Sequence, residues 1–315
     1  MRKVFAIGEL AYDTIFRQGK PVDAFMGGHV ANAAAVMGQV GLPCCMVGEC
    51  CDDVVGDLIV GRLTDCHVDV DAVDRFTQGA TAMTAVFEDT PQPRVINYGT
   101  YPSERFDVVW PRINEDDIVL FGSLYAIDVP QRERFYEFIS YAASRHAILM
   151  YLPGVEHGMP CQITRVMASL LENMEMAHIT LCTQPHLAEL FPGETPAEAF
   201  RNHIDQSDNT YLHIAPGDAV TLYRCDVTES VSNQMPSLEN SLGWHAGFVA
   251  GVAAMLLKMD IKLADVPAMT VDQWREIVAV ALPLARDCER HGNLPSPELA
   301  SRLRNSLQQP SPTQE

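Results

Sequence analysis

The chain has no long uninterrupted run of apolar residues, and nowhere does it approach the roughly eighteen that a membrane-spanning helix needs. After Met1-Arg2-Lys3, the apolar run Val4–Ile7 is too short for a signal peptide. Basic residues are also scarce, because 22 Lys and Arg stand against 41 Asp and Glu, for a net charge of -19. Such a surface repels phosphate backbones and anionic membranes. We therefore expect a cytoplasmic protein that binds neither nucleic acid nor membranes.

A recognisable zinc pattern is also missing, although the chain has nine cysteines. Cys44, Cys45, Cys50 and Cys51 form two adjacent pairs, but their spacing is not that of usual zinc sites. The segment Cys44–Val47 has the composition of a buried strand, so these thiols are expected to act as small buried hydrophobic groups. The sequence therefore identifies no metal-ligand set.

What is present indicates a large α/β domain. Of the 315 residues, 47% are hydrophobic and 20% are charged, as in ordinary globular proteins. Short apolar runs alternate with helical periods, which predicts a mostly parallel sheet flanked by helices. The expected strands are Val4–Ile7, Cys44–Val47, Ile118–Leu120, Ile148–Leu152, His178–Cys182, Tyr211–Ile214 and Ala219–Tyr223. The expected helices are Val30–Val40, Val54–Leu63, Gln131–Ser144, Ile163–Met174, Trp244–Lys258 and Val271–Cys288.

Two β-like stretches interrupt this alternation. Residues 14–26 and 81–98 are broken by glycine and proline, and they predict a small projecting β-sheet lid. No linker is long enough to split the protein. We expect one domain over residues 1–307 and a disordered tail over 308–315, where polar residues and proline dominate.

Two glycine-containing stretches near the start suggest a ligand site. They are Gly27–Asn32 (GGHVAN) and Val47–Gly56 (VGECCDDVVG). Paired glycines let the backbone approach a ligand, and the start of a helix offers unpaired N–H groups. The amide of Asn32 has both donors and an acceptor, which suits recognition of hydroxyl groups.

Together with Gly8–Asp13 (GELAYD), these stretches resemble the first signature of the ribokinase/PfkB sugar-kinase family, in its fructokinase-like branch. The resemblance implies a ribokinase-like fold with a β-sheet lid. In that family, the acidic residue after the first strand and the Asn after the glycine pair bind sugar hydroxyls. Here these residues would be Asp13 and Asn32, with Gly27 and Gly28 shaping the pocket. A small-molecule sugar is the partner implied.

The later family signature, D-T-x-G-A-G-D-x-F-x-A-G, is similar to Asn240–Gly251 (NSLGWHAGFVAG). The F-x-A-G end fixes the register and places Ala246 where the family has its catalytic Asp. Loss of a general base costs roughly 10²–10⁴-fold in rate. Trp244 and His245 replace a small Ala-Gly pair, so we expect their bulk to intrude where phosphate would approach. Gly243 remains from the anion hole.

Three other nucleotide-side stretches also differ from the family pattern. The family's N-x-x-E aligns with Gln184–Leu187 (QPHL), and its T-x-G-x-x-G loop aligns with Ala215–Val220 (APGDAV). The family also has a central D-P segment, and its Asp falls on Leu152. The likeness nevertheless covers about residues 3–295. ATP and Mg²⁺ are implied as cofactors only if the protein is an active kinase.

His245 is a candidate replacement base, because it directly precedes Ala246 and imidazole accepts protons near neutral pH. The alternative is a histidine at the start of a helix that bonds to a neighbouring loop. This alternative is favoured because no partner carboxylate is identifiable, although Glu239 and Asp218 are possible partners.

Three functions stay open from the sequence. The first is a sugar-binding protein on a kinase fold with impaired or absent phosphotransfer. The second is an active ATP-dependent carbohydrate kinase with rearranged catalytic residues. The third is a partner-binding protein, a homodimer through the lid sheet, in which an edge strand such as Thr81–Phe87 pairs across a two-fold axis.

Overall fold

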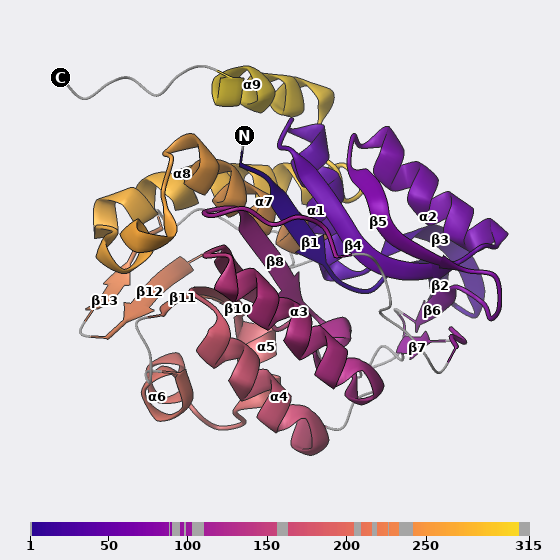
Figure 1. The fold of residues 1–315 in the computed structure, drawn as a ribbon, viewed down its shortest axis with the longest axis horizontal. Coiled ribbons are helices and arrows are strands. Elements are labelled where there is room, and N and C mark those ends of the chain that lie inside the picture. Colours follow the sequence, from indigo (N-terminus) through magenta and orange to yellow (C-terminus); the bar gives the residue numbers. More distant parts are fainter. Residues whose placement is uncertain are drawn as a thin grey trace.

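A nine-stranded sheet lies at the centre of the protein in the computed structural model (Figure 1). The structure describes residues 2–87, 89, 95–97, 99–102, 110–155, 163–204, 209–215, 219–225, 227–232 and 242–308. The strands, in spatial order, are β13 (Val227–Ser230), β12 (Ala219–Arg224), β11 (Thr210–Ala215), β10 (Ile179–Thr183), β9 (Ile148–Leu152), β8 (Ile118–Gly122), β1 (Val4–Ile7), β4 (Cys44–Cys51) and β5 (Asp69–Phe76). From β11 to β5 all neighbours are parallel, whereas β12 and β13 are antiparallel additions.

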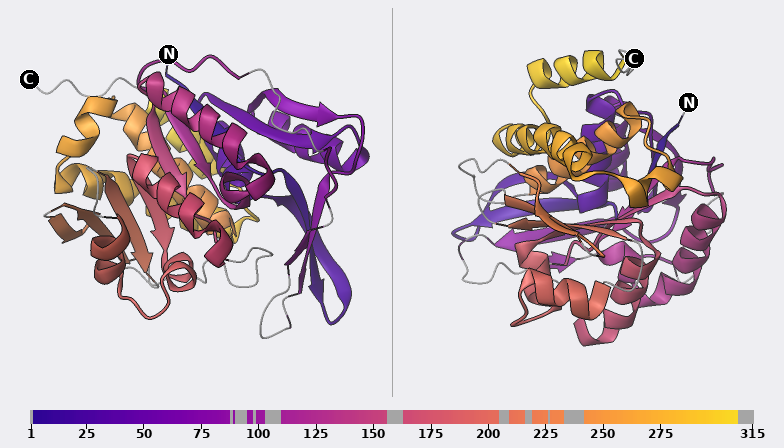
Figure 2. Two further views of the ribbon diagram at one scale, coloured as in Figure 1. Left: turned by 60° about the horizontal axis from the view of Figure 1, so that its bottom comes forward. Right: turned by 90° about the vertical axis from the view of Figure 1, so that its left-hand side faces the viewer.

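Helices cover both faces of this sheet, as Figure 2 shows from the side. One apolar cluster joins the sheet to α1 (His29–Gln39), α2 (Val54–Asp65), α7 (Leu242–Lys258) and α8 (Val271–Arg290). The other joins it to α3 (Arg132–Ser144), α4 (Ile163–Met176), α5 (Gln184–Leu190) and α6 (Pro196–Ala199). The short helices η1 (Leu124–Ile127), η2 (Val129–Gln131), η3 (Phe200–Ile204) and η4 (Leu263–Ala268) and the last helix α9 (Pro297–Gln308) complete the domain.

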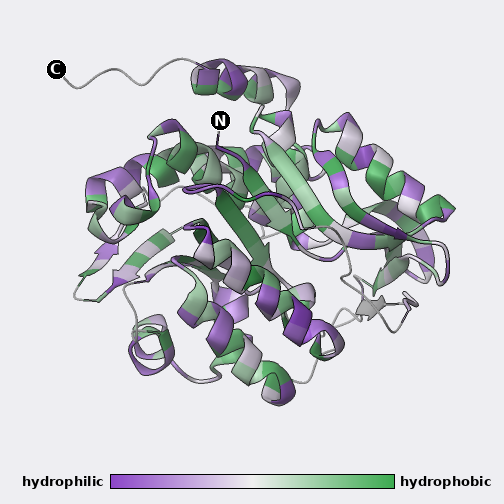
Figure 3. Cartoon of the chain, viewed as in Figure 1, coloured by the Kyte–Doolittle hydropathy of each residue, from purple (hydrophilic) through white to green (hydrophobic). Residues whose placement is uncertain are grey.

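The residues of β1 explain why the central strands are continuous apolar runs. Val4 and Ala6 belong to the first cluster, while Phe5 and Ile7 belong to the second. Successive side chains of a strand point to opposite faces, so a sheet covered on both sides needs apolar residues at every position. The hydrophobic colour of the central strands, against the more polar outer helices, follows this rule (Figure 3). The predicted α/β fold class is confirmed.

Buried thiols line β4. Cys44, Cys45, Cys50 and Cys51 are all 4% exposed or less, as expected for small hydrophobic groups in a strand. Burial raises the pKa of both the Cys45 and the Cys50 thiol to about 12. Cys225, in the turn between β12 and β13, is instead exposed.

A separate four-stranded sheet projects from the main body, as the left panel of Figure 2 shows. Its strands, in order, are β3 (Lys20–Gly27), β2 (Ala11–Arg17), β6 (Ala82–Phe87) and β7 (Val95–Asn97). The predicted lid is therefore present. The choice of Thr81–Phe87 as an edge strand was wrong, because β6 pairs with β2 on one side and with β7 on the other. Among the described strands, the edges of the lid are β3 and β7.

Several elements were absent from the sequence prediction, among them β5 and α9. Strand β5 alternates charged and apolar residues at the rim of the large sheet, so it has no continuous apolar run. Helix α9 packs its apolar side on the body, where Arg304 donates to the carbonyl oxygen of Gln39 at 2.7 Å. The expected tail lies outside the described residues, except for Gln308 at the end of α9.

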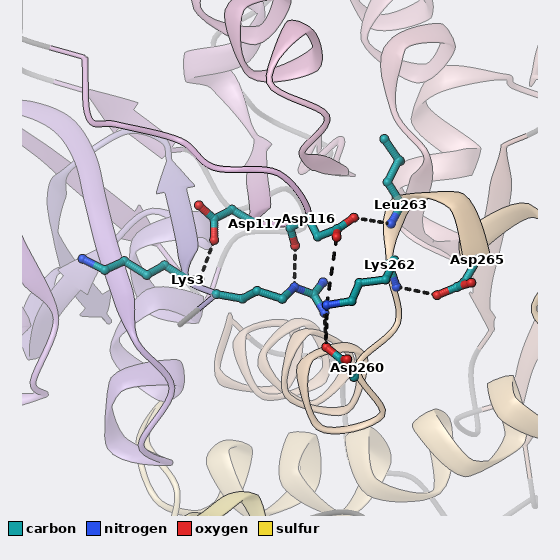
Figure 4. A network of polar contacts seen from close by, with 8 residues as sticks. Lys3, Asp116, Asp117, Asp260, Lys262, Leu263 and Asp265 are labelled. Carbon is teal, nitrogen blue, oxygen red and sulfur yellow. Dashed lines mark hydrogen bonds and ion pairs between the residues drawn. The ribbon is translucent and has the colours of Figure 1, made fainter.

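A polar network closes the amino-terminal edge of the large sheet (Figure 4). The carboxylate of Asp117 is fully buried and accepts from the backbone N–H groups of Lys3 and Asn114, each at 2.8 Å. Its neighbour Asp116 accepts from the N–H of Leu263 at 2.9 Å. The network therefore ties the starts of β1 and β8 to the segment that follows α7.

Replacing Asp117 with alanine is expected to lower the free energy of unfolding by about 3 kcal/mol, because two partly buried N–H groups lose their charged acceptor. Urea unfolding monitored by circular dichroism measures the loss. The control is Asp272→Ala, since the Asp272 side chain is 88% exposed. That variant should change stability by no more than about 0.5 kcal/mol. Equal effects of the two substitutions would contradict this account of the network.

Candidate functional site

The carboxyl ends of β1, β8 and β10 bring the candidate residues together at one edge of the large sheet. Ligands of open parallel sheets bind at this edge, because the connections that follow the strands surround a crevice there. Gly8 follows β1, Ser123 follows β8, and Thr183 ends β10. The first residues of α1, α5 and α7 approach the same place, and the lid begins at β2 beside it.

The glycine pair allows two close approaches that any side chain would block. Gly28 has a φ of +87°, and a Cβ there would lie 2.4 Å from the carbonyl oxygen of Glu9. A Cβ on Gly27 would lie 2.3 Å from Oδ1 of Asp13. The Asp13 carboxylate therefore lies directly over Gly27. In this structure the groups that approach the glycine pair belong to the protein itself, and its approach to a ligand stays a prediction.

Asp13 is held in an environment that disfavours its charge. It lies on β2 opposite Thr84 of β6. Burial raises the pKa of the Asp13 carboxyl group to about 6, against the opposing effects of the Thr84 hydroxyl and His29. The nearby Glu9 carboxylate adds to the increase. A carboxylate held at such a cost, beside a glycine turn, is a candidate ligand-binding group.

Asn32 has a more structural role than the resemblance implied. Its side chain is 4% exposed, and its amide nitrogen donates to the carbonyl oxygens of Met26 and Gly28, each at 2.9 Å. The two donors of the amide therefore hold the loop that precedes α1. Any contact with a ligand falls to the amide oxygen.

Three histidines meet where these elements converge. His29 begins α1, His186 lies in the first turn of α5, and His245 lies in the first turn of α7. The ring centroid of His245 lies 5.6 Å from that of His29 and 5.4 Å from that of His186. All three rings are at most 7% exposed. The sequence analysis singled out His245 alone, and neither His29 nor His186 was among its candidates.

The environment of Ala246 is apolar. Ala246 is 1% exposed and belongs to the core cluster between the sheet and α8. Trp244 lies in the same cluster, where its ring stacks on Phe248 with centroids 5.3 Å apart. Trp244 therefore packs into the core, whereas the sequence had led us to expect it in the approach to the phosphate site. Only His245 of the replaced pair faces the other site residues.

Gly243 serves helix packing. A Cβ on it would lie 2.7 Å from Oδ1 of Asn293, just after α8. Gly247 and Gly251 continue the same stripe, and a Cβ on either would lie within 2.6 Å of a Cα atom of α8. The three glycines let α7 and α8 cross closely. Gly243 as a remnant of an anion hole stays a prediction.

The structure describes only some of the residues that align with the other nucleotide-side motifs of the family. Gln184–Leu187 forms the first turn of α5, with Thr183 as its N-cap, and Leu152 ends β9 as a buried residue. Within Ala215–Val220, residues 216–218 lie outside the described part of the protein, as do the possible His245 partners Glu239 and Asp218.

A family model described as pfkB family carbohydrate kinase matches residues 1–206 of this chain, which is more than half of it. The chain belongs to the pfkB carbohydrate kinase family. No curated protein matches it. Among the described residues, no helix of this PfkB-family protein combines the length and hydrophobicity that crossing a bilayer requires.

Solved structures of sugar kinases share the fold. A fructokinase double mutant from Vibrio cholerae O395, in a form with fructose, ADP and potassium, has a TM-score of 0.78 at 14% identity, covering 98% of this chain and 99% of its own. An uncharacterized sugar kinase from Pyrococcus horikoshii has a TM-score of 0.75 at 16% identity. The match covers 97% of this chain and 100% of that kinase. Aminoimidazole riboside kinase from Salmonella enterica has a TM-score of 0.71 at 16% identity, and this match also covers 97% of this chain and 100% of the kinase. At these identities the likeness establishes the ribokinase-like fold.

Proposed function

We propose that this PfkB-family protein binds a small sugar or sugar derivative and that its phosphotransfer is impaired or absent. The sugar-binding residues are Asp13 and the amide oxygen of Asn32, above the turn formed by Gly27 and Gly28. The observation that carries the proposal is the environment of Ala246. Ala246 aligns with the family's catalytic Asp in the motif comparison, and its methyl group is buried in the apolar core. A proton acceptor for the sugar hydroxyl is therefore lacking at that position.

The retained half of the site supports sugar binding. The partly buried Asp13 carboxylate lies over Gly27, the Asn32 amide bonds to the adjacent Gly28, and Thr84 interacts with the carboxylate from the neighbouring strand. Paired acceptors at the end of parallel strands suit the hydroxyl groups of a sugar. Mg²⁺-ATP is not required for this binding.

The second candidate is an active ATP-dependent carbohydrate kinase with His245 as a replacement base. One observation favours it: the ring of His245 lies 5.6 Å from that of His29, which interacts electrostatically with Asp13. In that case Asp13 would orient the sugar and an imidazole would accept its proton. ATP and Mg²⁺ would then be the cofactors.

A thermal-shift screen with and without Mg²⁺-ATP, across pentoses, hexoses and sugar acids, separates the two candidates. Ligands that bind only the native state raise Tm, so a shift with a sugar alone is expected. In a coupled assay, ADP formation should be no faster in the wild type than in His245→Gln. Sugar-dependent ADP formation that His245→Gln abolishes would overturn the first candidate in favour of the kinase. The absence of any sugar shift would leave the partner-binding function.

The lid also supports a homodimer through β3, the described edge strand next to β2. Residues 20–24 of β3 are exposed, and the side chain of Val22 is 50% exposed. Unpaired backbone groups along such an edge can pair with a second copy. Light scattering after size exclusion is expected to give the mass of a dimer, and Val22→Lys to give that of a monomer. A monomeric wild-type protein would contradict this assembly.

A further inference from the structure

Three histidines from three distant segments converge at the carboxyl edge of the sheet. His29, His186 and His245 each offer a ring nitrogen, and the three nitrogens lie within 4.8 Å of one another. The rings are 7%, 0% and 4% exposed. Each histidine lies in a stretch that aligns with a family signature, yet none is part of the pattern itself. Simple core filling does not account for three buried imidazoles whose nitrogens point to one place.

The spacing suits a metal ion. Tetrahedral zinc binds imidazole nitrogens at about 2.0–2.1 Å, which places the ligand nitrogens about 3.4 Å from one another. The three nitrogens now lie within 4.8 Å of one another, so each ring must move by about 1 Å or less to reach the spacing of a zinc site. Small side-chain rotations are enough for such a movement. Three nitrogen ligands leave a fourth position for water or for an oxygen of another ligand.

His29 has a contact that orients it as a ligand, whereas His186 has a contact that ligation would break. Oγ of Ser123 lies 3.4 Å from Nδ1 of His29, so the hydroxyl can accept a hydrogen bond from Nδ1–H and leave Nε2 as the ligand atom. The N–H of Thr183 points to Nδ1 of His186 at 3.4 Å. If His186 binds the metal through Nε2, its ring proton must be on Nδ1, and Nδ1 can then no longer accept from Thr183. This contact is long for a hydrogen bond, so little is lost.

The surrounding charge favours a cation. Three imidazolium groups packed this closely would repel one another, whereas neutral imidazoles bind one metal ion without that repulsion. The starts of three helices oppose positive charge here. The Asp13 carboxylate offsets this effect, because it interacts favourably with His29, and the Glu9 carboxylate adds a second negative charge nearby. Imidazole ligands suit Zn²⁺, Cu²⁺, Ni²⁺ and Fe²⁺, while Mg²⁺ and Ca²⁺ prefer oxygen.

We propose that His29, His186 and His245 together bind one divalent transition-metal ion, with Zn²⁺ as the best match to three neutral nitrogen ligands. The ion lies where the proposed sugar-binding residues meet the first turn of α7. This proposal does not rest on sugar binding or on phosphotransfer, because the ligands are contributed by the protein alone.

The test uses the untagged full-length protein, stripped with a chelator and titrated with Zn²⁺ against a chromophoric competitor, without sugar or nucleotide. We expect one equivalent to bind with a dissociation constant below about 1 µM, an affinity that rises with pH as ligand protons are displaced. Bound Zn²⁺ should also raise Tm. Co²⁺ should give the visible absorption of a tetrahedral nitrogen site.

Variants assign the site. We expect His186→Gln and His245→Gln each to weaken Zn²⁺ binding at least 100-fold. The control is His291→Ala, which changes a half-exposed histidine at the end of α8 and should bind Zn²⁺ like the wild type. The Trp244 ring contacts His245 with centroids 5.7 Å apart, so Cu²⁺ should quench its fluorescence. This quenching should be lost in Trp244→Phe, which keeps an aromatic ring against Phe248. Comparing Cu²⁺ quenching in the wild type and in Trp244→Phe tests the site even if a histidine variant fails to fold.

Failure of the stripped wild-type protein to bind one equivalent of Zn²⁺ more tightly than about 10 µM would overturn the proposal. Equal Zn²⁺ affinity in the wild type and in a folded His245→Gln variant would also overturn it, because the metal would then bind elsewhere. Either result leaves the sugar screen unaffected, and a failed sugar screen leaves the metal titration unaffected. The two proposals therefore fail separately.

Discussion

Replacing Asp13 with asparagine is expected to weaken sugar binding about 100-fold while making the unliganded protein more stable at pH 8. The two effects have opposite signs because the buried carboxylate is useful to a ligand and costly to the fold. A charge-assisted hydrogen bond contributes about 1.5–3 kcal/mol to binding, which sets the size of the loss. Isothermal titration calorimetry with the sugar identified in the screen measures it.

The stability gain depends on pH in a defined direction. Burial raises the pKa of the Asp13 carboxyl group from 3.8 to about 6 in the folded protein. Below about pH 3 the group is protonated in both states and carries no penalty. As the pH rises from about 3 to about 6, the unfolded state loses its proton first, so the folded state becomes progressively less stable. Above pH 6 the penalty is constant.

Asp13→Asn removes this penalty, so it should raise the free energy of unfolding by about 1–2 kcal/mol at pH 8, after allowance for partial contact with water. At pH 3 the gain should vanish. Urea unfolding at both pH values measures the difference. As a control, Asp23→Asn on the exposed part of β3 should show no such pH dependence. A destabilised Asp13→Asn protein at pH 8 would contradict the proposed environment of the carboxylate.

The second large effect concerns the crossing of α7 and α8. Gly247→Ala is expected to lower the free energy of unfolding by about 3 kcal/mol, because the added methyl group meets backbone atoms that cannot rotate away. The new Cβ would lie 2.6 Å from the Cα of Ala285 and 2.8 Å from the carbonyl oxygen of Leu284. Relief requires the two helices to separate, which also loosens the apolar cluster beneath them.

Gly61→Ala is the matched control, since Gly61 lies inside α2 with no heavy atom within 4 Å of an added Cβ. The same chemical change should there stabilise the protein by about 0.5–1 kcal/mol through helix propensity. Thermal and urea unfolding compare the two variants directly. If both substitutions were stabilising, the close helix crossing would be refuted.

The sequence predicted the layers of the fold well, because strands buried on both faces are apolar at every position. It missed β5, where Asp69 and Asp74 interrupt the apolar pattern at the edge of the sheet. It also misassigned β6 as an edge strand, since nothing in its own residues indicates that β7 pairs with it. Strand order depends on residues that are far apart in the sequence.

The candidate site was predictable only where the residues are close in sequence. The glycine turn and Asp13 follow from local motifs, and the structure brings them together. The meeting of His29, His186 and His245 could not be predicted in this way, because it requires the order of three strands and the entry points of three helices. A usable signal was present, since a histidine falls within each of three aligned signature stretches.

The buried thiols of β4 have a consequence for chemical labelling. Alkylating reagents attack the thiolate, and burial suppresses that form at Cys45 and Cys50 as well as blocking access to them. Among the cysteines that the structure describes, Cys225 alone is exposed. A maleimide dye therefore attaches there in the native protein, at the antiparallel end of the large sheet. Among the described cysteines, Cys225 thus offers the attachment point for distance measurements to the lid.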